Sequence, residues 1–409
     1  MKLERYMAPG ALAAMLTAPA AAQDIGPASD TARFVLDSGL LFAGGLAAMV
    51  MLTGFCMREV GLARTQHAPA VCLRMIGGFG ICALAFWLTG FNLIETVEPD
   101  GLLGRFALWA PGDEDPMNAG RASAAAWFFQ MSLAGLGAAV VSGAVSERVK
   151  LWPFLIFIGA YCGLIYPITA SWAWGGGYFR DSWSFFDYGG AAVIHVTAGA
   201  AALAAALTVG PRPGKYAADA PRLAPTTALP LSTFGLGLMV PAWLIVLAAR
   251  GQSLSSVEAA ISISNITANA LLAAAAGVLA AIFVTQVVYK RAGLVTGLSG
   301  LAAGLVSISG DPLHPALWQA AMIGAVGGVI VTVAPPFLDR ARIDDAAFVI
   351  PAHLFCGLWG VAIVSWTNEN IWLTGQLAGA VGIGGFAFFL SLLFWVALKY
   401  TIGVRLPPA

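Results

Sequence analysis

Two histidines, His195 and His353, lie inside long apolar stretches of the sequence, where an ionisable side chain is costly and indicates a functional role. Each is followed four residues later by a glycine and preceded eight residues earlier by an aspartate. A neutral imidazole has one ring nitrogen that donates a hydrogen bond and one that accepts. If the two rings share a proton through one nitrogen each, the other nitrogens can face a small polar substrate. Two unrelated core histidines are the alternative.

A metal pair is a rival interpretation of the same two histidines. No further histidine, cysteine or carboxylate lies at a plausible ligand spacing, however. The five cysteines occur singly and read as small buried apolar residues. The other histidines, His67 and His314, are expected to be solvated in loops. The sequence therefore predicts no metal and no cofactor.

Two further residues near His195 could bind a cation or serve the structure. Asp187 lies at the expected start of the helix that carries His195, where a carboxylate caps the helix and is favoured by its dipole; cation binding is the alternative. Trp174 precedes three glycines at the expected outer edge of a membrane. Tryptophan is a common interfacial anchor there, and it is also the best aromatic face for a small cation.

The composition indicates what surrounds these residues. Of 409 residues, 59% are hydrophobic and 10% are charged, whereas a typical soluble protein has about 25% charged residues. The 21 basic residues balance the 21 acidic ones. Such a chain cannot cover a soluble surface, which excludes a cytosolic globular enzyme, a disordered protein and a basic nucleic-acid binder. We expect an all-α polytopic membrane protein that is not an enzyme.

Eleven apolar runs are long enough, with one short exception, to be tilted transmembrane helices. Strands of a membrane β-barrel would be about half as long and would alternate in polarity. The predicted spans are 34–57, 75–94, 124–145, 151–172, 189–209, 229–249, 266–288, 294–308, 316–334, 348–366 and 377–398. The eighth span is the short one and is rich in glycine.

The two histidines fall in the fifth and tenth spans, which predicts an internal repeat of five helices. An odd number of spans in each half forces the halves into opposite orientations, so the repeats are inverted and an eleventh helix is extra. Inverted repeats in transporters place the site at the middle of the membrane, between the repeats. The predicted architecture is two five-helix inverted repeats plus one helix.

The first residues resemble a secretory signal peptide. Lys2 and Arg5 precede a short apolar stretch that ends in alanines at residue 22. Residues 1–22 are therefore predicted to be removed, and residues 23–409 to form one membrane domain with its N-terminus outside the cytoplasm. Basic residues concentrate in the connections that this orientation makes cytoplasmic. They include Arg58, Arg148, Arg212 and those of the C-terminus, which is predicted to be cytoplasmic, so we expect a multi-pass protein of the inner (plasma) membrane.

Several of these segments together resemble the ammonium transporter family (Amt/Mep/Rh). The resemblance covers nearly the whole mature chain. The matching segments are Trp174–Gly177, Asp187–His195 with Ala198 and Gly199, Gly143–Arg148, Leu298–Val306, and Asp344–Asp345 before His353.

The resemblance implies a homotrimer in which each subunit has its own pore for ammonium or ammonia. The positions of the family's pore and outer-site residues correspond here to His195, His353, Trp174, Phe129, Gln130, Leu133, Trp243 and Val246, with Asp187 and Arg250 as supporting residues. Leu133 and Val246 stand where the family has pore phenylalanines. Arg250 stands where it has a small hydroxyl residue, and an arginine there repels ammonium unless it points away. Few residues follow Lys399, which makes control by a PII-type regulator doubtful.

These observations leave three hypotheses open. The first is an ammonium/ammonia transporter that recruits the cation at Trp174, deprotonates it and passes ammonia along His195 and His353. The second is a non-conducting ammonium sensor of the same fold. The third is a channel for another small solute, which the altered gate residues favour.

Overall fold

The structure is a computed structural model that describes residues 28–216 and 228–407. The predicted signal peptide, residues 1–22, lies outside the described residues. Every regular element of the described chain is a helix, apart from an isolated bridge between Val149 and Arg405. Helices are expected here because lipid offers the backbone no hydrogen-bond partners, so apolar segments must satisfy their polar groups internally.

The first five apolar runs form the first repeat, with three short helices in its connections. Its spans are α2 (Asp30–Leu62), α3–η2–α4 (Ala68–Ala85, Phe86–Gly90, Phe91–Glu95), α6 (Ser123–Ala144), α7–η3–α8 (Leu151–Ala160, Tyr161–Ile165, Tyr166–Ala173) and η4–α10 (Ala191–Val196, Thr197–Val209). The connecting helices are η1 (Thr65–His67), α5 (Pro116–Ala119) and α9 (Tyr178–Trp183).

The second repeat and the last helix follow. They comprise α11 (Leu229–Arg250), α12 (Val257–Tyr289), α13 (Leu294–Ile308), α14–α15 (Leu317–Val333, Pro335–Arg340), η5–α16–α17 (Ile350–Phe355, Cys356–Ala362, Val364–Thr367) and α18 (Leu373–Thr401). In the described part of the chain, ten helical stretches are long and apolar enough to cross a membrane, and α13 is a shorter apolar helix. The predicted eleven-helix membrane fold is thus consistent with the structure.

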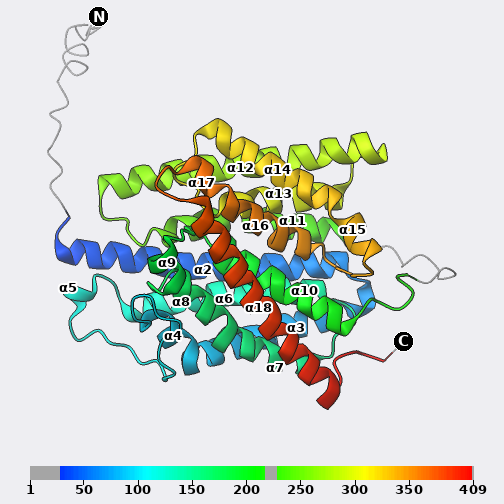
Figure 1. Ribbon diagram of the computed structural model, residues 1–409, viewed down its shortest axis with the longest axis horizontal. Helices are drawn as coiled ribbons and strands as arrows, with labels where there is room; N and C mark the ends of the chain where they lie inside the picture. Colours follow the sequence, from blue (N-terminus) through cyan, green and yellow to red (C-terminus); the bar gives the residue numbers. More distant parts are fainter. Residues whose placement is uncertain (1–27, 217–227, 408–409) are drawn as a thin grey trace, which may run out of the picture.

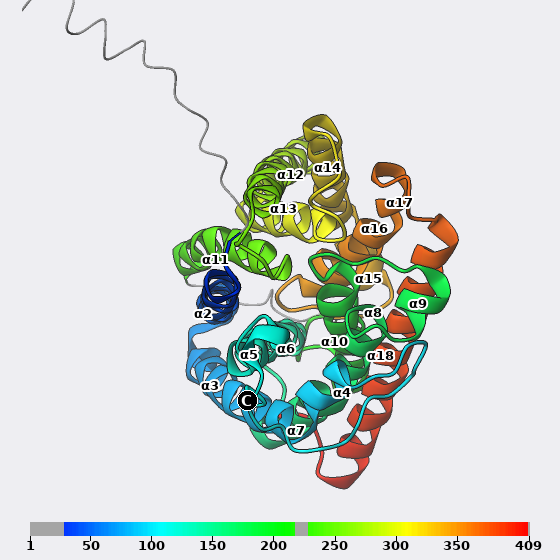
Figure 2. The ribbon, with the colours of Figure 1, turned by 90° about the vertical axis from the view of Figure 1, so that its left-hand side faces the viewer.

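The two repeats lie side by side, and α2 packs along α11 where they meet (Figures 1 and 2). Helix α18 crosses the outside of the bundle at an angle and packs on α10 (Figure 1). Between α2 and α11, a Cβ on Gly54 would lie 2.6 Å from the carbonyl oxygen of Gly235, and a Cβ on Gly235 would lie 2.6 Å from that of Gly54. This reciprocal contact explains why both positions lack a side chain, because small residues let helices approach closely in lipid.

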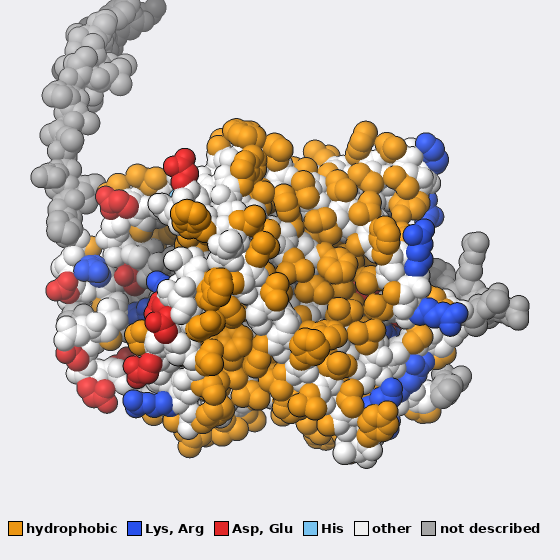
Figure 3. All heavy atoms as spheres, viewed as in Figure 1, with side chains coloured by type: hydrophobic (Ala, Val, Ile, Leu, Met, Phe, Trp, Pro, Cys, Tyr) orange, Lys and Arg blue, Asp and Glu red, His pale blue; other side chains and the backbone are white. Residues whose placement is uncertain are grey.

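The charged side chains gather at the two ends of the molecule. In Figure 3, acidic side chains lie mainly at the left-hand end and basic ones at the right-hand end, with an apolar girdle between them. The prediction that Arg58 lies in a loop is wrong. It lies within α2 and donates hydrogen bonds to the Ala347 carbonyl (2.6 Å) and Ser299 Oγ (3.0 Å). The guanidinium can be buried because these acceptors satisfy its N–H groups. Arg148 does lie in a connection but is also buried.

Candidate functional site

Two π-helical turns carry the histidines that the sequence singled out. His195 lies in η4 and His353 in η5, at the starts of the fifth and tenth spans. Gly190, just before η4, has φ +94°, a left-handed conformation that glycine adopts without strain. Pro351, in the first turn of η5, lacks an N–H group where a helix has no partner for one. π-turns of this kind occur often at functional sites.

Asp187 caps the N-terminal end of η4 and is itself buried. Its Oδ1 accepts hydrogen bonds from the backbone N–H groups of Gly190 (3.0 Å) and Ala191 (2.8 Å), and its Oδ2 accepts from Ala192 and Val193 (both 2.9 Å). A helix start has four N–H groups without intrahelical partners, and this one carboxylate takes four N–H groups at the start of η4. In the other repeat, Asp345 Oδ2 accepts from Ile350 N (2.7 Å), whereas its Oδ1 is buried without a partner.

Glycines let the two π-helical segments cross in contact. A Cβ on Gly199, four residues after His195, would lie 2.5 Å from the backbone nitrogen of Leu354. A Cβ on Gly357, four residues after His353, would lie 2.8 Å from the carbonyl oxygen of Ala191. Each glycine therefore makes room for the segment that carries the other histidine.

The crossing brings His195 and His353 together. Their Nδ1 atoms are 3.1 Å apart, their ring centroids are 5.1 Å apart, and both side chains are buried. A hydrogen bond between two Nδ1 atoms requires one of them to carry the hydrogen and the other to accept it. Both Nε2 atoms therefore remain outside the pair. Among the described residues, no group of three histidine, cysteine, aspartate or glutamate side chains could hold a metal ion.

Aromatic rings cover the pair from two other helices. Trp243 of α11 stacks on His195 with ring centroids 5.2 Å apart and an interplanar angle of 29°. The ring centroid of Phe55, in α2, lies 5.8 Å from the ring centroid of His353. Phe55 was missed at the sequence level, since nothing in the apolar pattern of α2 distinguishes it from its neighbours.

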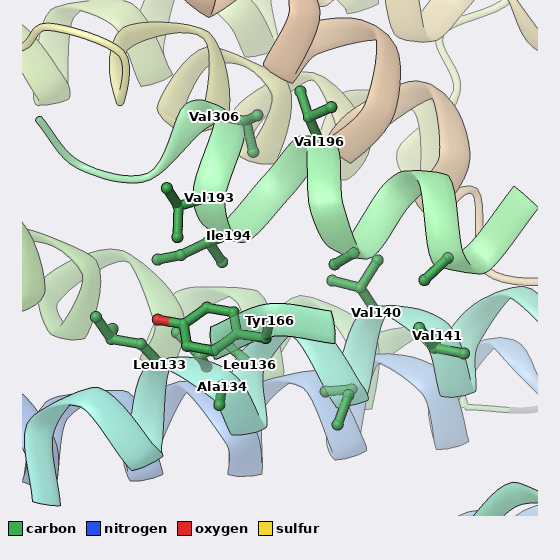
Figure 4. Close-up of a cluster of buried hydrophobic side chains, with 14 of the residues drawn as sticks. Leu133, Ala134, Leu136, Val140, Val141, Tyr166, Val193, Ile194, Val196 and Val306 are labelled. Atoms are coloured by element: carbon green, nitrogen blue, oxygen red, sulfur yellow. The ribbon is translucent and has the colours of Figure 1, made fainter. Parts of the chain in front are cut away.

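The remaining predicted pore residues of α6 and α11 are also buried. Phe129, Gln130 and Leu133 follow one another along α6, and Gln130 Oε1 accepts a hydrogen bond from the Tyr166 hydroxyl at 3.4 Å. Leu133 and Tyr166 lie opposite Val193 and Ile194 of η4 (Figure 4). Val246 lies in α11 and is 3% exposed. Leu133 and Val246, which the resemblance matches to phenylalanine positions, are thus both enclosed.

Arg250 does not point away from Trp174. The Trp174 indole is half-buried, and its Nε1 donates to the backbone oxygen of Asp187 at 2.7 Å. The central carbon of the Arg250 guanidinium lies 3.7 Å from the Trp174 ring centroid, and Nε of Arg250 donates to the Tyr188 carbonyl at 3.1 Å. The sequence places Trp174 and Arg250 at outer-site positions of the family that they resemble, but it could not show that the two side chains stack on each other.

His314 makes a local ion pair in the connection before α14. Its Nδ1 lies 2.7 Å from Asp311 Oδ2, and this hydrogen bond holds the pKa of His314 above its usual range. A raised pKa in the folded state means that the stabilisation is fully present below the unfolded pKa of about 6.5 and is lost as the pH rises through the folded value.

We expect the difference in melting temperature between the wild-type protein and His314→Ala to be larger at pH 5.5 than at pH 8.5. Thermal unfolding of purified protein in detergent measures it. His67→Ala is the control, because burial lowers the pKa of His67 and its dependence should have the opposite sign. A difference for His314→Ala that grows with pH would contradict the assigned ion pair.

Comparisons with known proteins agree with this architecture. A model of the Ammonium Transporter Family matches residues 40–409. Ammonium transporter Amt2 of Archaeoglobus fulgidus is 31% identical, with 89% of this chain and 82% of that protein covered. A putative ammonium transporter of Synechocystis is 32% identical, with 96% and 90% covered.

Solved structures share the fold over nearly the same length. A protein described as a sensor Amt protein superposes with a TM-score of 0.86 at 25% identity, covering 93% of this chain and 97% of that one. Mep2 of Candida albicans superposes with a TM-score of 0.82 at 22% identity, covering 93% and 88%.

Proposed function

The chain belongs to the ammonium transporter family, and from that premise we propose that it carries ammonium nitrogen across a membrane along His195 and His353. The observation that carries the proposal is the Nδ1–Nδ1 contact of 3.1 Å between two buried histidines from opposite repeats. A chain that needed only stability has little use for two such rings in an apolar interior, because burying a polar group is costly and the contact between the rings uses only one nitrogen of each.

The species that passes the histidines is neutral ammonia in this proposal. A bare cation in an apolar passage pays a desolvation cost of several kcal/mol or more. Ammonia both donates and accepts hydrogen bonds, and so does a pair of neutral imidazoles whose Nε2 atoms are not used within the pair. The pair can therefore replace part of the water that ammonia loses, while Na⁺ and K⁺ gain nothing comparable.

The other proposed pore residues surround this centre. Phe129, Leu133 and Val246 supply apolar walls that exclude hydrated ions, and Trp243 fixes the ring of His195 by stacking on it. Gln130 supports the wall through Tyr166. Trp174 forms an aromatic platform near Asp187 and Arg250, and Asp187 and Arg250 have supporting roles.

We further propose a homotrimer in the inner (plasma) membrane, with the N-terminus outside and the C-terminus in the cytoplasm. The family membership supports the assembly. The separation of acidic and basic ends supports the orientation, since basic residues favour the cytoplasmic side (Figure 3). In this orientation residues 1–22 are a cleaved signal peptide and residues 23–409 form one domain.

Purified protein in liposomes tests the function. Wild-type protein is expected to raise the internal pH after a pulse of ammonium chloride faster than protein-free liposomes do, because entering ammonia binds a proton inside. An internal pH dye measures the rate. Swelling assays with other small solutes serve as the control for a less selective channel.

A sensor is the second candidate, because the structural relative at 25% identity is described as a sensor. Saturable binding of ammonium to the purified protein, without any increase in the rate of internal alkalinisation, would select it. Faster swelling with other solutes at the same protein density would instead select a channel of another specificity.

A further inference from the structure

The Trp174 ring, the aromatic platform described above, is already covered by a cation of the protein itself, the Arg250 guanidinium. The Arg250 guanidinium lies 3.7 Å from the centroid of the Trp174 ring, which is direct contact with the ring face. A cation–π contact requires the cation over the ring within about 6 Å. The indole is fixed in place by its hydrogen bond to the Asp187 carbonyl. A free cation can therefore reach this face only if Arg250 leaves it.

One hydrogen bond to the backbone holds Arg250 on the platform, and the described residues provide no ion pair for it. Its Nε donates to the Tyr188 carbonyl at 3.1 Å. The oxygens of the nearby Asp187 are engaged by four backbone N–H groups, and among the described residues no carboxylate lies within 4.0 Å of Arg250. The ionisable groups that act on it are Tyr166, Asp187, Tyr188 and the like-charged Arg121. A second cation at the platform would thus meet a positive charge that has no ion-pair partner among the described residues.

One terminal nitrogen of Arg250 lacks the hydrogen-bond acceptor that its N–H groups need. Nη1 is buried and has no hydrogen-bond partner. A guanidinium only donates hydrogen bonds, so this group needs an acceptor. Ammonia has a lone pair and can accept, whereas ammonium, Na⁺ and K⁺ have no lone pair to offer.

We propose that Arg250 is a specificity-determining residue: as a tethered cation on Trp174 it excludes ammonium and other free cations and admits neutral ammonia. This inference rests on the proposed transport function. In this scheme ammonium gives its proton to water outside, ammonia crosses alone, and it takes a proton from water inside. No net charge crosses with the nitrogen.

The test compares charge movement with ammonia entry in the same liposomes. For wild-type protein, a pulse of ammonium chloride should give internal alkalinisation above that of protein-free liposomes and a transient current no greater than theirs. Arg250→Ser frees the platform and should raise the current at least about tenfold. Arg121→Ser is the matched control, because it removes an outer arginine that lies 3.6 Å from Glu95 and is not stacked on Trp174. It should give no current.

The outcomes separate the two proposals. A wild-type current equal to that of Arg250→Ser, or no current from either, overturns the role of Arg250. An absence of alkalinisation in every protein overturns the transport function itself. Arg250→Gln replaces Arg250→Ser if the serine variant does not fold.

A measurement on wild-type protein alone adds an independent check. The external pH is lowered by one unit while the total concentration of ammonium plus ammonia is raised, so that the ammonia concentration stays constant and the ammonium concentration rises tenfold. The rate of internal alkalinisation should be unchanged, because ammonium does not compete for the platform. A rate that saturates or falls as ammonium rises overturns the proposal.

Discussion

Replacing His195 and His353 together by alanine is expected to reduce ammonia entry to the rate of protein-free liposomes. The two side chains form a polar pair in an otherwise apolar surrounding. A polar molecule left without a partner in such a place costs about 1–3 kcal/mol for each lost hydrogen bond. Two lost bonds raise the barrier by about 2 kcal/mol or more, which is roughly a 30-fold loss of rate.

The single variants should lose nearly as much as the double one. Because each Nδ1 is the partner of the other, His195→Ala leaves His353 with a buried nitrogen that has no partner, so the effects should not add. Internal alkalinisation at equal protein density measures the rates. His314→Ala is the matched control, since His314 is exposed in a connection. Normal rates in a folded double variant would refute the twin-histidine centre.

Replacing Asp187 by alanine is expected to give a large loss of stability. The substitution removes the acceptors of four buried backbone N–H groups at the start of η4. At about 1 kcal/mol or more for each orphaned donor, the free energy of unfolding should fall by about 4 kcal/mol. Asp187→Asn keeps one acceptor oxygen and should lose about half as much. Thermal unfolding in detergent measures both.

The other repeat provides the matched control for Asp187. Asp345 precedes His353 by the same eight residues, but its Oδ1 has no partner and Ile350 N donates to its Oδ2. We therefore expect Asp345→Ala to lower the melting temperature less than Asp187→Ala does. An equal or larger loss for Asp345→Ala would show that the four N–H contacts of Asp187 are not what stabilises η4.

The parts of this fold that follow from hydropathy could be predicted from the sequence. Helix α13 covers the same residues as the predicted eighth span, 294–308, because glycine and loop residues bound it. Helix α12 begins at Val257, nine residues before the predicted span, because Ser256 caps it and the helix continues beyond its apolar part. Hydropathy shows where a helix can be buried, not where its hydrogen bonds end.

The candidate site was predictable only in part, for a related reason. The shared spacing of aspartate, histidine and glycine in the two repeats reflects backbone packing, since Gly199 and Gly357 each make room for the opposite segment. The π-helical turns leave no such pattern in the sequence. They differ from an α-helix only in which backbone carbonyl each N–H group bonds to, and the side chains along the run are apolar in either case. The stacking of Arg250 on Trp174 joins residues far apart in the chain, and no local signal marks it.

The glycine contacts between the repeats also limit how the passage can operate. Gly54 with Gly235, and Gly199 and Gly357 with the opposite π-turns, hold the two halves at backbone distance. Many transporters with inverted repeats rock one half against the other to change access. Here such rocking would break the contacts that bring His195 and His353 together. For the proposed transport, these contacts favour equilibration along a fixed path, in which nitrogen moves down its own gradient.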